Sequence, residues 1–356
     1  MIKIFLSFDF YGAGNIGDDL MLDGFLNEMK SSNIEFYCSL PRDPYSQKIR
    51  FPEINFVRSE DRVNAAYLCN IWIGVGDTPI QVKSGSWFMD HLLKDSELKK
   101  EKKIKYYFIG IGAESEAVTE KANYKAILNE TEHIWTRDKA TTDILIKKIG
   151  IKAERITTSS DLANISLSKI LLTQGRTDKK KYDIGMCYFD ENAESVNLDA
   201  VKKFLKNAVK KNKRVLAFGN EVRKEGKYEY KIYMNMFNRL ERLFGSIKYY
   251  QPDYYNLNKV SDLIRHYSTC EVIMTSRFHS LLTAAWAGCK VVALERSSKV
   301  SALAEDLGIK EVKKPFTPDK LMQSYDESSI VDIDILKRFH EQAVSSTESL
   351  KKQIFL

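Results

Sequence analysis

Short apolar runs typical of β-strands alternate with longer amphipathic segments along the 356-residue chain. This alternation constrains the fold most strongly, because it favours parallel sheets built from right-handed βαβ units. In the first half we expect strands over Ile2–Ser7, Glu35–Ser39, Asn55–Val57, Leu68–Val75, Lys105–Gly110, Ile134–Thr136 and Arg155–Thr158. In the second half we expect them over Asp183–Cys187, Arg214–Phe218, Ser246–Tyr250, Glu271–Met274 and Lys290–Leu294. The helical patterns between them include Asp19–Lys30, Trp87–Lys99, Lys139–Lys148, Leu198–Lys210, Glu229–Leu243, Lys259–His266 and Val300–Leu307.

The chain is long enough for two domains, each with its own core. A polar, basic segment within Ser166–Lys181 precedes a new strand and marks the expected break. We therefore expect an α/β protein with two Rossmann-like lobes, residues 1–170 and 182–332, facing a cleft. A C-terminal helix over residues 333–356 is expected to pack back on the first lobe. In open α/β sheets ligands bind at the carboxyl ends of the strands, so the loops there are the places to look for chemistry.

The net charge of +7 arises from 55 basic and 48 acidic residues, so both signs are plentiful. The excess fits an anionic substrate, a loose attraction to an acidic membrane surface, or simply a soluble surface. The chain has no basic stripe interleaved with aromatic residues, so we expect no nucleic-acid partner.

The five cysteines are scattered and form no CxxC pair, which argues against a zinc site or a disulfide framework. No other metal-ligand cluster is visible in the sequence, so we expect no metal. The N-terminal apolar run is too short for a signal peptide, and no run approaches the ~20 apolar residues that cross a bilayer. The expected compartment is the cytoplasm, where the inner face of the membrane is accessible.

The segment Thr275-Ser276-Arg277-Phe278-His279-Ser280 lies between an apolar strand and an Ala-rich helix. Backbone N–H groups and the helix dipole favour an anion at such a turn. Arg277 adds a cation, and His279 is the one histidine of five that falls in this setting. The turn therefore predicts a phosphorylated substrate with a proton donor beside it, and Ser276 and Phe278 are expected to contact the substrate.

Two further strand ends carry charged residues. The segment after Lys290–Leu294 contains Glu295, Arg296 and Lys299, at the same edge of the predicted second sheet. In the first lobe Arg137 follows the strand Ile134–Thr136, where a guanidinium is suited to a bidentate phosphate or carboxylate contact. A structural ion pair of Arg137 with Asp138 or Asp161 is the alternative, and Asp138 with Thr141 fits a helix N-cap.

The loop after the first strand contains Gly12, Gly14 and Gly17 at the offsets of GxGxxG. A dinucleotide site would also require an acidic residue at the end of the next strand, but Leu40-Pro41-Arg42 follows there. We therefore interpret the loop as a backbone cradle with Asn15 and Asp18 projecting toward a ligand. A tight turn that lets strand and helix pack is the alternative.

Asp77 follows the apolar strand that ends at Val75 and is flanked by Gly76. Glycine at a strand end permits close approach of a ligand. Asp77 is therefore a candidate acceptor for a sugar hydroxyl proton, and a plain turn is the alternative.

Taken together in chain order, these motifs resemble the polysaccharide pyruvyl transferase family. The resemblance spans about residues 4 to 308. The matching pieces are Gly12-x-Gly14-Asn15-x-Gly17-Asp18, Arg137-Asp138, Asp161-Leu162-Ala163, Ser276-Arg277-Phe278-His279 through Gly288, Val291–Leu294 and Lys299. Two features depart from the family pattern: Val75 and Asp77 interrupt its glycine run, and Leu162 replaces its proline.

The resemblance implies a fold similar to GT-B glycosyltransferases, with an acceptor-side first lobe and a donor-side second lobe. It implies phosphoenolpyruvate as the donor substrate and no cofactor. Pyruvate would be transferred as a ketal onto a sugar of a cell-envelope polysaccharide, such as an exopolysaccharide, or onto its lipid-linked precursor.

Phosphoenolpyruvate carries a phosphate and a carboxylate, and Arg277 and Arg137 can supply cations for both, with Lys299 nearby. Protonation of its methylene carbon requires an acid, for which His279 is the natural choice. Asp18, Asp77 or Glu295 can accept the hydroxyl proton, and Asp18 is our first choice.

Two other classes of function fit the same residues. A GT-B glycosyltransferase would use the Arg277–His279 turn to hold a nucleotide sugar, with Glu295 as a ribose ligand. A non-catalytic binding module would tolerate loss of Arg277 or His279, and both residues are present.

Overall fold

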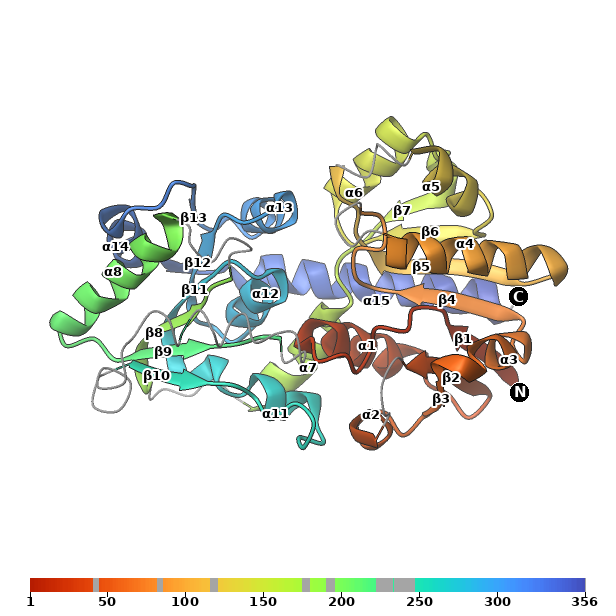
Figure 1. Cartoon of the computed structure of the whole chain (residues 1–356), viewed down its shortest axis with the longest axis horizontal. Helices are drawn as coiled ribbons and strands as arrows, with labels where there is room; N and C mark the ends of the chain where they lie inside the picture. The colour runs from red at the N-terminus through yellow and green to blue at the C-terminus, as the bar shows by residue number, and fades with distance from the viewer. Residues whose placement is uncertain are drawn as a thin grey trace. The chain divides into compact units, whose positions relative to one another are not determined.

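The computed structural model describes residues 1–40, 45–81, 86–115, 121–174, 180–189, 196–221, 233 and 247–355 (Figure 1). Its contacts divide the chain into two compact units. Unit 1 comprises Met1–Ala13, Asp18–Ser166 and Lys337–Leu356, and unit 2 comprises Gly14–Gly17 and Leu167–Leu336. The short segment Gly14–Gly17 therefore belongs to unit 2 by its contacts, whereas the residues on both sides of it in the chain belong to unit 1.

Unit 1 contains a seven-stranded parallel sheet with the order β3-β2-β1-β4-β5-β6-β7. The strands are β1 Ile2–Leu6, β2 Ile34–Leu40, β3 Ile54–Arg58, β4 Ile71–Val75, β5 Lys105–Ile111, β6 His133–Thr136 and β7 Ile156–Thr158. The strand order reverses between β1 and β4, which is the switch point where α/β sheets bind ligands.

Aromatic side chains form the centre of the unit 1 core. Phe5 on β1, Trp72 on β4 and Tyr106 on β5 are fully buried and contact one another edge to face, with ring centroids 5.9 Å apart in each pair. The core is therefore continuous across the switch point of the sheet.

The helices of unit 1 come from both ends of the chain. They are α1 Ile16–Met29, α2 Tyr45–Arg50, α3 Arg62–Tyr67, α4 Ser86–Glu101, α5 Lys121–Leu128, α6 Lys139–Asp143, the first part of α7 Ala163–Gln174 and most of α15 Ile333–Phe355. The Ser159 hydroxyl donates to the carbonyl of Gln342 at 2.9 Å, which fixes α15 beside the end of β7.

Unit 2 contains a second parallel sheet with the order β10-β9-β8-β11-β12-β13, and β14 pairs antiparallel with β12. The strands are β8 Tyr182–Cys187, β9 Val215–Phe218, β10 Ile247–Tyr250, β11 Cys270–Thr275, β12 Lys290–Leu294, β13 Glu311–Val312 and β14 Ser329–Ile330. The order reverses between β8 and β11, so the switch point of this sheet lies where β11 leads into the Arg277 turn.

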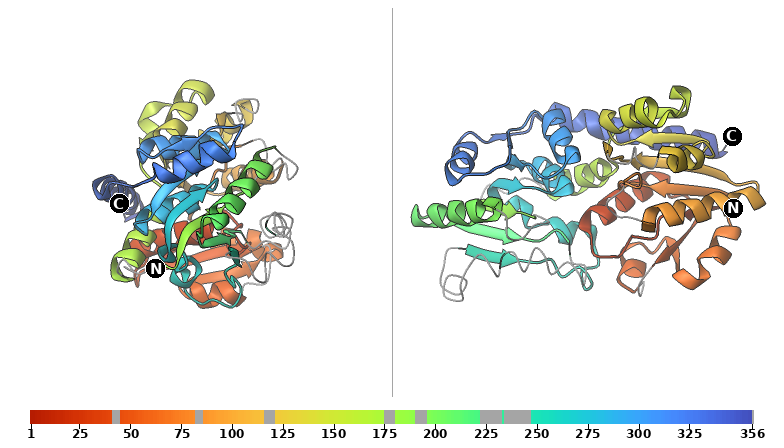
Figure 2. Two further views of the ribbon diagram at one scale, coloured as in Figure 1. Left: turned by 90° about the vertical axis from the view of Figure 1, so that its left-hand side faces the viewer. Right: turned by 45° about the horizontal axis from the view of Figure 1, so that its top comes forward.

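Helices α8 Val196–Lys210 and α14 Pro318–Asp326 contact each other and cover one face of the unit 2 sheet (Figures 1 and 2). Alternate strand residues, such as Val215 and Ala217, point into this core. Helices α11 Val260–Ile264, α12 Phe278–Trp286 and α13 Ser298–Asp306 complete the described helices of the unit.

The predicted fold class is confirmed: both units are Rossmann-like α/β domains with parallel sheets. Most expected strands lie within two residues of the observed ones, but Leu68 and Cys69 are not part of β4, which begins at Ile71. The contacts divide the two units between Ser166 and Leu167, at the start of the expected break Ser166–Lys181, and α7 continues across this division to Gln174. The predicted helix Glu229–Leu243 lies outside the described residues, except for Tyr233.

Short elements with little pattern were missed. Strands β13 and β14 have two residues each, and α2, α3, α5 and α14 have nine or fewer.

All five cysteines are buried free thiols. Among the described residues, no helix is long and apolar enough to cross a membrane.

His266 is a buried member of an aromatic cluster in unit 2. Its ring lies 4.6 Å from those of Phe218 and Tyr267 and 4.9 Å from that of Tyr250. Burial lowers the pKa of His266 from 6.5 to about 3, because the charged imidazolium loses its hydration there.

We predict that His266 makes the protein less stable as the pH falls below about 6.5, because the unfolded chain then binds a proton that the folded chain excludes. Between about pH 7.5 and pH 5, His266→Phe should lose about 2 kcal/mol less unfolding free energy than the wild type. Urea denaturation at both pH values measures this difference. Tyr267→Phe, a non-titrating change in the same cluster, should keep the wild-type pH dependence, and an unchanged dependence in His266→Phe would contradict the account.

Candidate active site

Two hydrogen bonds of one hydroxyl hold the switch point of unit 2 together. The buried Ser276 hydroxyl accepts from the N–H of Phe189 at 2.9 Å and donates to the Phe189 carbonyl at 3.0 Å. Beside it, the Thr275 hydroxyl donates to the Cys187 carbonyl at 2.9 Å. The residues that follow β8 and β11 are therefore fixed relative to each other. The hydroxyl of Ser276, which was predicted to contact the substrate, makes both of these hydrogen bonds with the backbone of Phe189.

Arg277 is the N-cap residue of α12. Its backbone is extended, with φ −107° and ψ 130°, and its N–H donates to the Thr275 hydroxyl at 3.1 Å. A guanidinium cannot accept a hydrogen bond, so the Arg277 side chain does not cap the first turn of α12. The turn thus combines a helix N-terminus with a cation, as the sequence predicted, and Phe278 is buried at the first helical position.

The Arg277 guanidinium contacts the side chains of Glu221 and Phe189. Nη2 lies 2.9 Å from Oε2 of Glu221, and Cζ lies 4.3 Å from the centre of the Phe189 ring. The Cζ of Arg296 lies 4.6 Å from the same ring centre. Two guanidinium groups therefore gather at Phe189, and one carboxylate offsets part of their charge.

His279 lies in the first turn of α12, against the segment Gly14–Gly17. A Cβ built on Gly17 would lie 2.0 Å from Nδ1 of His279, so no larger residue fits without moving the ring. The segment is tied to the rest of unit 2 by the Asn15–Glu221 bridge and by a hydrogen bond from Ile16 N to the Asn220 carbonyl at 3.3 Å.

Within this segment, the Asn15 side chain accepts from Gly17 N at 3.1 Å, which forms a local turn. A contact of Asn15 with a ligand stays a prediction. Gly14 has φ +101°, a conformation that side chains rarely adopt. Asp18, which follows the segment directly, is buried in the first turn of α1.

Glu295 and Lys299 follow β12. The Glu295 carboxylate accepts from the N–H of Lys314 at 2.7 Å and lies 3.6 Å from Nζ of Lys313. Lys299 is half-buried in the first turn of α13. Glu295 is therefore held toward β13.

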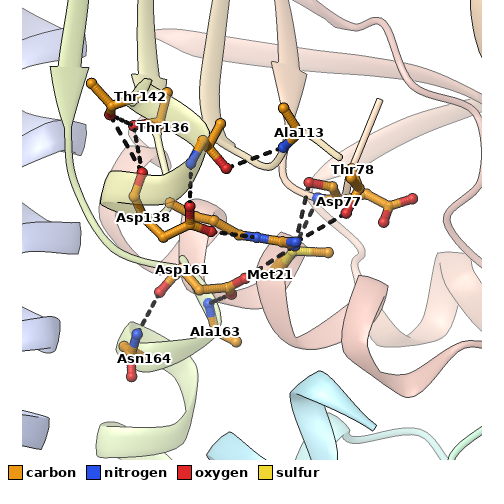
Figure 3. Close-up of polar contacts among 12 residues, drawn as sticks. Met21, Asp77, Thr78, Ala113, Thr136, Asp138, Thr142, Asp161, Ala163 and Asn164 are labelled. Carbon is orange, nitrogen blue, oxygen red and sulfur yellow. Dashed lines mark hydrogen bonds and ion pairs between the residues drawn. The ribbon is translucent and has the colours of Figure 1, made fainter. Parts of the chain in front are cut away.

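Arg137 is buried within unit 1 at the end of β6. Figure 3 shows Asp77, Thr78, Asp138 and Asp161 gathered at this end of the sheet. The Arg137 guanidinium lies 3.4 Å from Asp138, 3.9 Å from Asp161 and 3.0 Å from the Thr78 hydroxyl, and it also donates to the Asp77 carbonyl at 3.4 Å. The ion-pair interpretation of Arg137 is confirmed, and its role as a substrate ligand stays a prediction.

The neighbours of Arg137 show how the loops of unit 1 are built. Asp138 caps α6 through a 2.6 Å hydrogen bond from Thr141 N, which confirms the predicted N-cap. Asp77 has φ +56°, and its carbonyl also accepts from Gly112 N at 2.7 Å. These contacts involve only the backbone of Asp77, so the role of its carboxylate as an acceptor of a sugar hydroxyl proton stays a prediction.

A carboxylate–imidazole pair that the sequence analysis missed lies at the switch point of unit 1. Asp9, three residues beyond β1, contacts His91 of α4, with Oδ2 and Nε2 2.7 Å apart. Burial raises the pKa of Asp9 to about 6 and lowers that of His91 to about 4. At neutral pH a neutral His91 can therefore donate to an ionised Asp9.

Glu221 and Phe189 are further residues of the unit 2 site that were not singled out, whereas Arg296 was noted among the charged residues after β12. Each follows the carboxyl end of a strand, which is the signal that could have identified them. Among the described residues, no group of three or more His, Cys, Asp or Glu side chains is placed to hold a metal ion.

The family model for polysaccharide pyruvyl transferase matches residues 15–298 of the chain. No curated protein sequence matches it. Among solved structures, the chain is similar to the UDP-GlcNAc 2-epimerase of Methanocaldococcus jannaschii in complex with UDP-GlcNAc and UDP, with a TM-score of 0.66, 13% identity and 99% of each chain covered. The UDP-GlcNAc 2-epimerase of Neisseria meningitidis gives a TM-score of 0.66 at 9% identity, again with 99% of each chain covered.

A third structure, Anabaena Alr3699/HepE in complex with UDP and glucose, gives a TM-score of 0.59 at 12% identity, with 98% of this chain and 95% of that one covered. At these identities the likeness concerns the fold alone. The two Rossmann-like domains are of the GT-B type.

We predict that Gly17→Ala destabilises the protein by about 1 to 3 kcal/mol, because its methyl group overlaps the His279 ring. In a His279→Ala background the same change should cost much less, since the ring is gone. Denaturant unfolding of the wild type, both single variants and the double variant measures this coupling. Strictly additive costs would contradict the contact.

Proposed function

Because the chain belongs to the polysaccharide pyruvyl transferase family, we propose that it transfers pyruvate from phosphoenolpyruvate to a sugar as a ketal, with release of phosphate. The acceptor is a sugar of a cell-envelope polysaccharide or of its lipid-linked precursor. The observation that supports this most directly is the Arg277 turn, which combines a helix N-terminus, a guanidinium and an imidazole within three residues of chain.

The donor binds in unit 2 through its two anionic groups. The N–H groups of the first turn of α12 and Arg277 bind one of them, because a helix N-terminus and a guanidinium both favour phosphate or carboxylate. The other anionic group binds Arg296, whose guanidinium lies over the same Phe189 ring as that of Arg277. Lys299, which like Arg296 follows β12, adds a third positive charge.

The first chemical step forms a bond between a sugar hydroxyl oxygen and C2 of phosphoenolpyruvate while His279 protonates C3. C2 becomes tetrahedral and carries the phosphate, the carboxylate, the new methyl group and the sugar oxygen. The nearby bound anion favours the protonated imidazole that this step needs. The ring of His279 packs closely against Gly17, which has no side chain in its way.

In the second step another hydroxyl of the same sugar attacks C2, and the bond from C2 to the phosphate oxygen breaks. Phosphate leaves with the electron pair. In this step, as in the first, a base takes the proton of the attacking hydroxyl and passes it to solvent, from which His279 regains the proton that it gave to C3. We assign the base to Asp18, which follows Gly17 directly in the chain. Glu295 is less suited, since Lys313 and Lys314 hold its carboxylate.

We place this reaction in the cytoplasm. A lipid-linked acceptor would bring the protein to the inner face of the membrane, where the net charge of +7 suits an acidic surface.

We predict that phosphoenolpyruvate raises the melting temperature of the wild type, because it binds only the folded protein. His279→Ala should keep this stabilisation but abolish phosphate release, measured by phosphorus NMR with a panel of lipid-linked and nucleotide-linked sugars. His340→Ala, a half-buried histidine of α15, is the control and should behave like the wild type. Stabilisation by a nucleotide sugar but none by phosphoenolpyruvate would refute the proposal and favour a glycosyltransferase.

Glu221 opposes anion binding at Arg277, since its carboxylate lies 2.9 Å from that guanidinium. Glu221→Gln keeps a hydrogen-bond acceptor there and removes the negative charge. We predict a KM for phosphoenolpyruvate that is lower by about 3- to 10-fold, as expected for loss of one charge about 6 Å from the donor in a partly solvated site.

Steady-state kinetics measure this effect, and Glu271→Gln is the control. Glu271 is also paired with a cation, Lys290 at 3.2 Å, but its side chain is 44% exposed and precedes the buried part of β11. A higher KM in Glu221→Gln would show instead that the carboxylate is required to orient Arg277.

A further inference from the structure

A second concave site in unit 2 is formed away from the Arg277 turn. A pocket of about 820 Å³ is lined by residues of the strands β8, β9 and β10 and of the segment after α11. Lys181, Arg214 and Thr269 in its lining each precede a strand by one residue. The pocket therefore reaches the amino ends of the strands, whereas the Arg277 turn lies at a carboxyl end.

The alternation of side chains along the strands gives the face on which the pocket lies. Val215, Ala217 and Ile247 point into the core under α8, so Leu216 and Lys248 point to the opposite face. In the sheet Lys248 and Leu216 are neighbours in register. Leu216 and Lys248 thus line the pocket from the face that α8 does not cover, whereas Tyr249, also in the lining, packs against the core under α8.

The charge of the pocket is strongly positive. Lys181, Arg214, Lys248 and Arg265 line it and are exposed. Arg214 is paired with Asp183 at 3.4 Å, but the other three have no carboxylate partner within 4.0 Å among the described residues. Such a concentration of cations in one concavity selects an anionic ligand.

His266 gives the pocket a specific recognition group. It lines the cavity and is only 6% exposed, and neither ring nitrogen has a hydrogen-bond partner in the part of the chain that the structure describes. Buried polar groups are nearly always hydrogen-bonded, so these nitrogens indicate a ligand that bonds to them. A neutral imidazole offers one donor and one acceptor, which match a hydroxyl group better than a fully ionised phosphate.

Tyr250 lies against His266, with ring centroids 4.9 Å apart, and also lines the pocket. Aromatic faces of this kind pack on the apolar face of a sugar ring, and the volume exceeds what a single phosphate or carboxylate needs. The lining therefore combines a ring platform, a hydroxyl-recognising imidazole and a rim of cations.

We propose that this pocket binds a segment of an acidic saccharide, with its carboxylates at the cationic rim and a ring hydroxyl at His266. The further assignment of this saccharide to the protein's own product rests on the proposed function, since every ketal that forms adds one carboxylate to the glycan. A product chain held here would keep the glycan on the protein between transfers.

The test uses the full-length protein and two matched probes, tri-galacturonic acid and its fully methyl-esterified form, in calorimetric titrations at about pH 8. The acid should bind at least tenfold more tightly than the ester. Lys248→Glu/Arg265→Glu should weaken binding of the acid at least tenfold, and His266→Phe should weaken it several-fold. Lys203→Glu, on an exposed position of α8 over the other face of the sheet, should bind like the wild type.

Three results would overturn the proposal: equal binding of acid and ester, complete competition by millimolar inorganic phosphate, or tighter binding of UDP than of the acid at the same residues. Phosphate release from phosphoenolpyruvate is measured in parallel. Release without saccharide binding refutes this inference alone, whereas binding without release leaves the pocket standing and refutes the proposed function. Normal thermal unfolding of His266→Phe at about pH 8 shows that its weaker binding is not a loss of fold.

Discussion

The double hydrogen bond between the Ser276 hydroxyl and the backbone of Phe189 is the contact on which the candidate active site depends. It joins the chain just beyond β8 and β11, where the strand order of the unit 2 sheet reverses. Because Phe189 is fixed in this way, the guanidinium groups of Arg277 and Arg296 have a common ring to lie on. A small buried hydroxyl thereby sets the position of the charges that we propose to bind the donor.

The absence of a side chain at Gly17 is the second constraint, because it lets a loop backbone approach His279. The same segment pairs with Glu221, which in turn contacts Arg277. His279 and Arg277, the proposed acid and the proposed donor-binding cation, are thus linked through one short piece of chain. Arg137 is used differently, since its guanidinium joins the loops after β4, β6 and β7 within unit 1.

The sequence was sufficient for the fold class because strands buried on both faces and amphipathic helices have strong periodic patterns. It was also sufficient for the Arg277 turn, where strand, charged pair and helix are contiguous. It was insufficient for Glu221, Phe189 and Asp9, whose importance arises from partners distant in the chain: Arg277, Ser276 and His91. Asn15 and Ser276 were predicted as ligands, but side-chain identity could not show that their polar atoms bond to nearby backbone.

The central claim is that His279 protonates C3 of phosphoenolpyruvate during addition of a sugar hydroxyl. The most direct measurement is the reaction in D₂O, followed by mass spectrometry and proton NMR of the product ketal. The account predicts one solvent deuterium in the methyl group of every newly formed ketal, with release of one phosphate. A product that retains the C3 methylene, or a methyl group free of solvent deuterium, would contradict it.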